Sequence, residues 1–282
     1  MTFAMTDEQL LALPLAYRSD LFKDQIVLVT GAGRGIGKAI AVQCARMGAN
    51  VVIAGRKAEP LEATASLLRR IGAEVVSMPM TIRDPDQVAA LFDAAYARFG
   101  RIDHLVNNAG GQYPQAAIDF TPKGWNAVVD TNLNGTWYMM QTAARRWRDH
   151  QQNGSIVNIV APYKRGMPGV AHTVAARGGV VALSITVAIE WAPLGIRVNC
   201  LVPGAIATEG MDVYPEDARR AMPYSNLMHR FGTVSDVANA VCYLTGPTGG
   251  FITGEVLTVD GGSQISGDIW TIPRPDYFKV PE

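Results

Sequence analysis

Cysteine is scarce in this chain of 282 residues. Its three cysteines, Cys44, Cys200 and Cys242, are far apart in the sequence and have apolar neighbours. That distribution is typical of buried, reduced thiols, and it favours neither a disulfide framework nor a metal site nor a cysteine nucleophile. We therefore expect a cytoplasmic protein that holds no metal.

An excess charge of one sign is also absent, because 25 Lys and Arg residues balance 25 Asp and Glu residues. This balance argues against nucleic acid or a membrane surface as a partner recognised through overall charge. Any site for an anion must then be local. The expected partner is a small-molecule substrate.

Long hydrophobic runs are missing as well. The most apolar stretch, residues 178–189, is bounded by Arg177 and Glu190 and is shorter than the roughly 20 residues that a bilayer span needs. It predicts a buried helix. The first 13 residues lack a basic segment before an apolar one, and the chain ends Lys-Val-Pro-Glu, so we expect neither a secretory signal nor a peroxisomal Ser-Lys-Leu address.

Short β-branched runs alternate with longer helical patterns along the chain. Strands are predicted at residues 25–30, 51–54, 74–78, 104–107, 155–160, 197–201 and 256–259. Helices are predicted at residues 36–47, 61–70, 86–99, 125–147, 174–191 and 234–244. This order indicates one α/β domain over residues 23–262, with an N-terminal arm (1–22), a C-terminal tail (263–282) and a mostly parallel sheet covered on both faces.

A glycine cluster follows the first predicted strand directly and opens the first long helix. Its sequence is Gly31-Ala32-Gly33-Arg34-Gly35-Ile36-Gly37. Glycines in this place let a backbone approach a pyrophosphate, and the helix N-terminus then faces the negative charge. The context predicts a seven-stranded, doubly wound Rossmann-like domain that binds a dinucleotide.

The spacing Thr-Gly-x-x-x-Gly-x-Gly of this loop resembles the short-chain dehydrogenase/reductase family. Three further segments occur in that family's order: Asn-Asn-Ala-Gly at 107–110, Asp-Thr-Asn at 130–132, and Pro-Gly at 203–204 followed by Thr208. The resemblance implies that Asn132 helps to hold an active-site water or a helix bend. It also implies a cofactor site formed by Gly31, Gly33, Arg34, Gly35, Ile36, Gly37, Asn107, Ala109, Gly110, Pro203, Gly204, Ile206 and Thr208.

The end of the second predicted strand bears on the choice of cofactor. It reads Ala54-Gly55-Arg56-Lys57, without the carboxylate that would bind the adenosine ribose hydroxyls of NAD. Arg56, together with Arg34, is placed instead to hold a 2′-phosphate, and Lys57 adds charge. A solvated helix start is the alternative interpretation of Arg56 and Lys57. The sequence thus favours NADP(H).

The residues of the family's usual proton transfer are replaced. Its Tyr-x-x-x-Lys motif reads Thr173-Val174-Ala175-Ala176-Arg177 here, and Val160 and Ala161 occupy the usual position of the substrate-binding serine. A threonine hydroxyl does not ionise near neutral pH, and an always-charged guanidinium is no chemical substitute for an amine. Ketone chemistry by the usual route is therefore not expected.

The same segments resemble the NADPH-dependent trans-2-enoyl-CoA reductases of the peroxisomal type and the 2,4-dienoyl-CoA reductases. In the second group a tyrosine just beyond the fifth strand replaces the missing one, and Tyr163 falls at that position. The resemblance implies reduction of a conjugated carbon–carbon double bond, most simply in an acyl-CoA. Tyr163 would then bind the developing enolate oxygen or relay the proton, assisted by Arg177 or Lys164.

Alternatives remain open at this point. Tyr113 or His172 could be the proton donor instead of Tyr163, and Tyr163 could be a surface aromatic. The chain could also be a ketone or alcohol oxidoreductase with an unconventional acid, or an NADP-binding pseudoenzyme. The family resemblance further implies a homotetramer, formed through the two long helices at residues 125–147 and 174–191.

Overall fold

Seven parallel strands form a single sheet in the order β3-β2-β1-β4-β5-β6-β7, which confirms the predicted doubly wound fold. The computed structural model describes residues 5–266, so parts of the predicted arm and tail, residues 1–4 and 267–282, lie outside the described residues. The strands are β1 (Ile26–Thr30), β2 (Asn50–Gly55), β3 (Val75–Pro79), β4 (His104–Asn107), β5 (Gly154–Ile159), β6 (Ile196–Pro203) and β7 (Val256–Val259).

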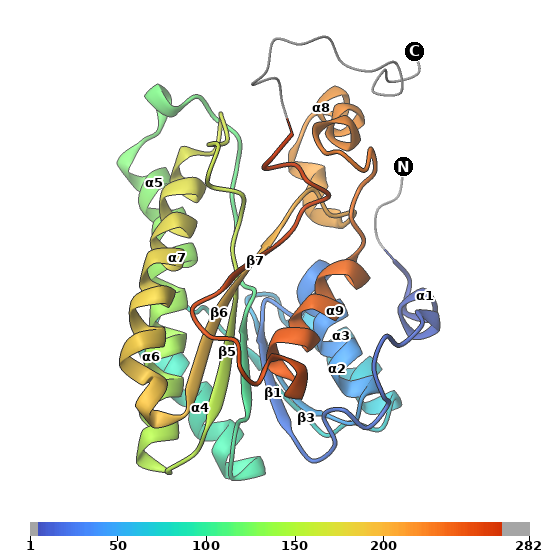
Figure 1. The fold of residues 1–282 in the computed structure, drawn as a ribbon, viewed down its shortest axis with the longest axis vertical. Coiled ribbons are helices and arrows are strands. Elements are labelled where there is room, and N and C mark those ends of the chain that lie inside the picture. The colour runs from blue at the N-terminus through green and yellow to red at the C-terminus, as the bar shows by residue number, and fades with distance from the viewer. Residues whose placement is uncertain (1–4, 267–282) are drawn as a thin grey trace.

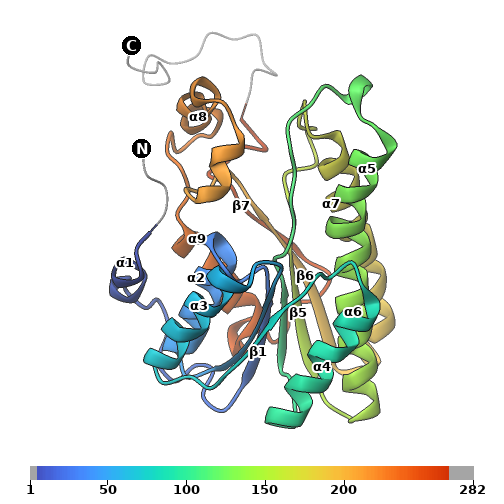
Figure 2. The ribbon, with the colours of Figure 1, turned by 180° about the vertical axis from the view of Figure 1, so that it is seen from behind.

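Helices cover both faces of this sheet. Figures 1 and 2 show α2, α3 and α9 on one face and α4, α6 and α7 on the other, whereas α5 and α8 stand on opposite sides beyond one end of the sheet. The helices are α1 (Asp7–Ala12), α2 (Gly35–Arg46), α3 (Ala58–Arg70), α4 (Pro85–Phe99), α5 (Pro122–Val129), α6 (Gly135–Asp149), α7 (Ala171–Trp191), α8 (Glu216–Ala221) and α9 (Val234–Thr245).

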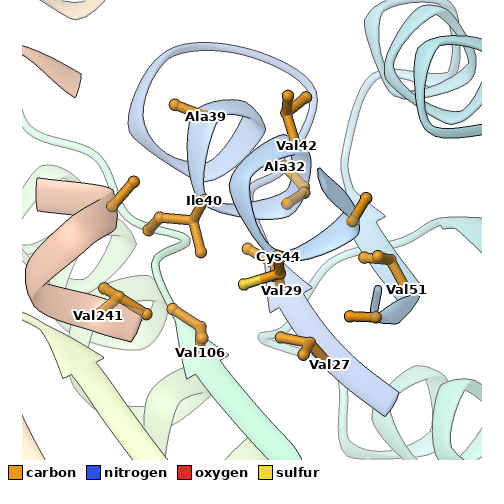
Figure 3. Packing of buried hydrophobic residues seen from close by; sticks show 14 of the residues in the cluster. Val27, Val29, Ala32, Ala39, Ile40, Val42, Cys44, Val51, Val106 and Val241 are labelled. Carbon is orange, nitrogen blue, oxygen red and sulfur yellow. The ribbon is translucent and has the colours of Figure 1, made fainter. Parts of the chain in front are cut away.

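The central strands are hydrophobic along their whole length because side chains alternate between two buried faces. In β1, Val27 and Val29 join the core under α2 and α9, whereas Ile26 and Leu28 join the core under α4 and α6. Figure 3 shows the first of these cores, in which Ile40 of α2 lies close to the strand valines. The sheet therefore separates two cores, each closed by its own helices.

Local signals account for several helix ends. Asp84 caps α4 by accepting hydrogen bonds from the backbone N–H of Asp86 and Gln87, and Gly100 ends that helix with a left-handed φ of 71°. Thr233 and Asp236 form a capping box at the start of α9. These ends agree with the predicted boundaries to within a residue or two.

The single helix predicted over residues 125–147 is wrong in detail. The structure has α5, one turn of π-helix (Asp130–Asn134) and α6 in its place. A π turn inserts an extra residue, so backbone carbonyls lose their regular helical partners and need others. The Thr136 hydroxyl donates to the Asn132 carbonyl at 3.0 Å and satisfies it within the chain. The short helices α1 and α8 were not predicted.

Helix α7 begins at Ala171, three residues earlier than predicted, and is therefore longer. With the turn that follows, Ala171–Leu194 is long and apolar enough to cross a bilayer by length and composition. Half of its most apolar window is buried, and the helix packs lengthwise against β6. We therefore interpret it as a core helix, in line with the sequence-based expectation.

The strand order fixes where a ligand can bind. The chain moves from β1 to β2 and β3 on one side and then returns to β4 on the other side of β1. The connections after β1 and β4 thus leave the sheet in opposite directions at its carboxyl edge. Ligands of open α/β sheets bind in the crevice at such a switch point.

Candidate active site and cofactor cleft

The loop after β1 packs tightly against the loop after β4. Gly31 has a φ of +67° and Gly35 a φ of +55°, values that favour glycine. A Cβ at Gly31 would lie 2.9 Å from the Ala109 Cα, and one at Gly37 would overlap the Asn108 amide. The predicted glycines are therefore needed for close approach between the two loops.

Hydrogen bonds fix this pair of loops. Asn108 Nδ2 donates to the carbonyls of Thr30 and Gly31 at 2.9 and 3.3 Å, and the Thr30 hydroxyl accepts from the backbone N–H of Asn108 and Ala109, both at 3.0 Å. The switch point is thus a rigid platform. Asn108 carries part of it, a role that sequence reasoning did not assign.

An open cavity of about 530 Å³ lies beside the platform. It brings together the three cations predicted to choose the cofactor, Arg34, Arg56 and Lys57, and all three are exposed. None of them forms an ion pair within residues 5–266. The carboxylate of Glu59 also reaches this cavity. The other lining residues include Gly31, Gly33, Gly55, Met80, Thr81, Ile82, Ala109, Gly110 and Thr131.

Asn107 is the last residue of β4, and only one end of its buried side-chain amide has a hydrogen-bond partner. Its Nδ2 donates to Asn158 Oδ1 at 2.8 Å, whereas its own Oδ1 has no partner in the described part of the chain. A buried acceptor left unpaired is costly unless a ligand supplies a donor. The glycine cradle, the three cations and this acceptor fit a dinucleotide with its phosphate and hydroxyl groups.

Thr208 and Glu209 approach the platform from the segment after β6. The Thr208 Cβ lies 3.5 Å from the place where a Gly35 Cβ would stand, and Glu209 Oε2 lies 3.7 Å from it. Thr208 therefore packs against the glycine loop at the start of α2. Glu209 was not foreseen, and it places a carboxylate at the N-terminus of α2, where the fold favours an anionic ligand.

Arg177 is buried, with 6% of its surface exposed, and it has no carboxylate partner among residues 5–266. Its guanidinium donates to the carbonyls of Ala109 at 3.2 Å and Asn132 at 3.4 Å. Burial lowers the Arg177 pKa to about 10, so the group stays charged at neutral pH. A Cβ at Gly110 would overlap Arg177 Nη2, which gives this glycine a steric reason.

Asn132 is buried in the π turn and uses both ends of its amide on one residue. Its Oδ1 accepts from the Gly111 N–H and its Nδ2 donates to the Gly111 carbonyl, both at 3.0 Å. Asn132 thus clamps the loop after β4 to the start of α6. Of the two roles that the resemblance implied, this geometry favours the one connected with the helix bend.

Thr173 and Tyr163 lie on the α7 side of the site. Thr173 is buried in the first turn of α7, and its backbone N–H donates to the Val170 carbonyl at 2.9 Å. Tyr163 is half-buried against a small cluster that contains Val160, Val181 and Cys200. Burial, with a contribution from Cys200, raises the Tyr163 pKa, and its hydroxyl has no hydrogen-bond partner in the described residues. Tyr163 is therefore a protonated hydroxyl at neutral pH.

The other two candidate donors, Tyr113 and His172, belong to an aromatic cluster. The His172 ring lies 4.8 Å from that of Tyr113 and 4.4 Å from that of Phe120, centroid to centroid. His172 is fully buried, and burial lowers its pKa, so it is neutral at pH 7. The Tyr113 hydroxyl lies against Gly124 in α5. Tyr113, Phe120 and His172 therefore pack on one another beside the start of α7.

A second cavity, of about 550 Å³, opens at the carboxyl edge of β5 and β6. Val160 and Ala161 line it, as do Pro203 and Gly204, so the predicted catalytic region and the end of the cofactor site share one space. Tyr163 is not among the residues that line it. Its remaining walls include Gln112, Pro162, Arg165, Met167, Met211, Tyr214 and Met222, and Tyr214 was not singled out from the sequence.

Comparison with known proteins agrees with this geometry. The family model described as "Enoyl-(Acyl carrier protein) reductase" matches residues 31–264, most of the chain. The chain belongs to the short-chain dehydrogenase/reductase family. Members of this family are oxidoreductases that use a nicotinamide cofactor, NAD or NADP, so membership supports an oxidoreductase with such a cofactor.

Individual relatives within the family carry two kinds of name. A probable 2,4-dienoyl-CoA reductase of Bacillus subtilis is 36% identical over 88% of this chain and 98% of its own length. A 3-oxoacyl-(acyl-carrier-protein) reductase of Staphylococcus aureus is 35% identical over 83% of this chain and 96% of its own. A short-chain dehydrogenase structure from Bacillus anthracis has a TM-score of 0.81 and 35% identity, covering 86% of this chain and 97% of that one.

Substitution of Gly110 tests the packing of Arg177. We expect Gly110→Ala to displace the guanidinium and to destabilise the fold by about 1–3 kcal/mol, the usual cost of overpacking, which lowers Tm by several degrees. Gly111→Ala is the matched control, because a Cβ there meets nothing within 4 Å. Thermal unfolding followed by circular dichroism measures both variants. Equal Tm values would contradict the close packing of Arg177 on Gly110.

Substitution of Glu209 tests its place at the N-terminus of α2. Glu209→Gln keeps the shape and removes a negative charge beside the expected pyrophosphate, so nicotinamide dinucleotide affinity should rise about 2–10-fold at low salt. Fluorescence titration measures the affinity. Glu216→Gln, in the exposed Arg220 ion pair of α8, should leave it unchanged. Weaker binding by Glu209→Gln would show that this carboxylate does not oppose the cofactor.

Proposed function

We propose that the chain is an NADPH-dependent reductase of a conjugated carbon–carbon double bond, in an enoyl-CoA or dienoyl-CoA thioester. The observation that carries the proposal is that only one part of the family's machinery is replaced. The residues expected to bind the cofactor are present, whereas Thr173 and Arg177 stand where family members carry the tyrosine and lysine of ketone chemistry. The relatives named 2,4-dienoyl-CoA reductase support the same choice.

NADP(H) is the proposed cofactor because of the charges around the cavity of about 530 Å³. Arg34, Arg56 and Lys57 can surround a 2′-phosphate, and Glu59 offsets only one of these three charges. The glycines of the platform and Thr208 would hold the pyrophosphate end, and Asn107 would accept from a ribose hydroxyl. When bound, the reduced nicotinamide supplies a hydride.

The protein's own side chains must then stabilise the negative charge of the enolate and supply a proton to the α-carbon. Addition of hydride to the β-carbon moves an electron pair onto the thioester oxygen, and the α-carbon takes up a proton. Tyr163 is the proposed donor toward this enolate, since its hydroxyl is protonated and has no partner within residues 5–266. The unpaired buried charge of Arg177 favours developing negative charge nearby, while Asn132 fixes the loop.

Ketone reduction is the second candidate function. The relatives named 3-oxoacyl-(acyl-carrier-protein) reductase favour it, at an identity close to that of the dienoyl-CoA reductases. Against it stands the buried threonine at position 173, which has no ionisable hydroxyl. An NADP-binding pseudoenzyme is the third candidate. The substrate assay described below separates the three.

We also propose a homotetramer in the cytoplasm. Helix α7 presents apolar side chains to solvent as well as to the core, notably Ile189, 74% exposed, and Ile185. Trp137 of α6 and Trp191 of α7 stack at 6.3 Å between ring centroids, so the two helices meet at an aromatic pair. Three buried free thiols, Cys44, Cys200 and Cys242, fit a reducing compartment.

A substrate scan with a Tyr163 variant tests the reaction. NADPH oxidation should be fast with crotonyl-CoA, longer enoyl-CoAs or a dienoyl-CoA and slow with 3-oxoacyl thioesters and simple ketones. Tyr163→Phe should lower kcat for the preferred thioester about 10²–10³-fold, the usual loss for one donor to an oxyanion. Faster ketone reduction would favour the second candidate, and tight binding without turnover the third. Nearly full activity in Tyr163→Phe would remove Tyr163 from the mechanism.

The preference for NADPH is tested at Arg56. Arg56→Ala should raise the KM for NADPH about tenfold and leave that for NADH nearly unchanged, because only NADPH carries the 2′-phosphate. Arg69→Ala is the matched control, because this arginine lies near the end of α3, its exposed side chain pairs with Glu62, and it does not line the cavity. A wild-type enzyme that prefers NADH would overturn the cofactor assignment.

A further inference from the structure

Two polar side chains meet across the cavity at the carboxyl edge of β5 and β6. Gln112 comes from the loop after β4, and Tyr214 comes from the segment after β6, 102 residues further along the chain. Both line the cavity, and Gln112 Nε2 donates a hydrogen bond to the Tyr214 hydroxyl oxygen. The contact therefore joins the two walls of the space in which a substrate would lie beside the cofactor.

The direction of this hydrogen bond leaves a donor available. Because the phenol oxygen accepts from Gln112, the phenol proton is free to be given to another group. Tyr214 is half-buried, and burial raises its pKa despite the opposing effect of the Gln112 hydrogen bond. Its hydroxyl is therefore protonated at neutral pH.

Besides Tyr214, the side chains of Arg165, Ser263 and Gln264 bring possible donors to this cavity, and Gln264 Nε2 donates to the Thr258 hydroxyl at 3.4 Å. Val160, Ala161 and Pro162 form the wall that follows β5, and none has a side-chain donor. The Ser225 hydroxyl, on the same side as Tyr214, is committed to the Met222 carbonyl at 2.7 Å. Met167, Met211 and Met222 add apolar surface to the lining. A carbonyl oxygen that enters this space without a hydrogen-bond donor would be desolvated at a cost of about 1–3 kcal/mol.

We propose that Tyr214 donates a hydrogen bond to the carbonyl oxygen of the conjugated thioester, and that Gln112 orients it. This assignment rests on the proposed function. When hydride adds to the β-carbon, the carbonyl oxygen receives an electron pair. The Tyr214 hydroxyl stabilises that negative charge by a hydrogen bond and transfers no proton to carbon. Tyr214 then acts on the oxygen from within the cavity.

Removal of a single hydroxyl tests the assignment. Tyr214→Phe should lower kcat about 10²–10³-fold for the thioester that the wild type reduces, while NADPH affinity by fluorescence titration stays within twofold. Binding of the saturated acyl-CoA product to the NADP⁺ complex should weaken about 3–10-fold, as expected for the loss of one hydrogen bond. Tyr224→Phe, an exposed hydroxyl in the same segment, is the matched control with unchanged kinetics.

A double-mutant cycle tests the role of Gln112 as a positioning residue. Gln112→Leu alone should reduce kcat by less than Tyr214→Phe does, with little change in Tm, and it should have no further effect in the Tyr214→Phe background. Additive losses in the double variant would show that Gln112 acts independently of Tyr214.

The outcomes separate this proposal from the one on which it rests. If the wild type reduces thioesters and Tyr214→Phe does so equally well, Tyr214 has no part in the reaction and only this proposal fails. If the wild type turns over no thioester, the proposed function fails. The assignment of Tyr214 then fails as well, because it requires a thioester carbonyl oxygen as the acceptor. A loss of NADPH binding in Tyr214→Phe would show a structural role instead.

Discussion

A buried guanidinium without an acidic partner is the constraint around which the catalytic half of this molecule is arranged. Arg177 joins three elements that are distant in sequence, since it starts in α7 and donates to the carbonyls of Ala109 after β4 and Asn132 in the π turn. Burying such a charge is costly unless its donors are satisfied. The π turn and the glycine at position 110 make the necessary acceptors and space available.

This arrangement explains why an arginine can occupy a lysine position without disrupting the fold. The loop after β4 is held twice, by Arg177 on the Ala109 carbonyl and by Asn132 on both polar groups of the Gly111 backbone. The platform that approaches the cofactor is thus intact although the family's usual ionisable pair is absent. The structure thus keeps the glycine platform in place while Thr173 and Arg177 replace the usual ionisable pair.

Much of the fold was accessible from the sequence because its signals are local. Strand residues such as Val27 and Leu28 are hydrophobic on both faces, and the glycine loop follows β1 without a gap, so periodicity and spacing predicted the sheet and the cofactor edge. The π turn was missed because Asn132 finds its partners through tertiary contacts. Tyr214 was missed for a similar reason: its meaning depends on Gln112, and no local pattern connects residues so far apart.

The short 3-10 helix Glu209–Val213 connects two side chains that line different cavities. Glu209 at its start adjoins the glycine loop, and Tyr214 directly after its end reaches the substrate cavity. A shift of this helix upon cofactor binding would move Tyr214 as well. The binding of cofactor and the binding of substrate would then be coupled through this helix. Thermodynamic reciprocity then requires that bound substrate alter the affinity for cofactor by the same factor. The segment after β6 therefore connects the glycine loop with the second cavity through one short helix.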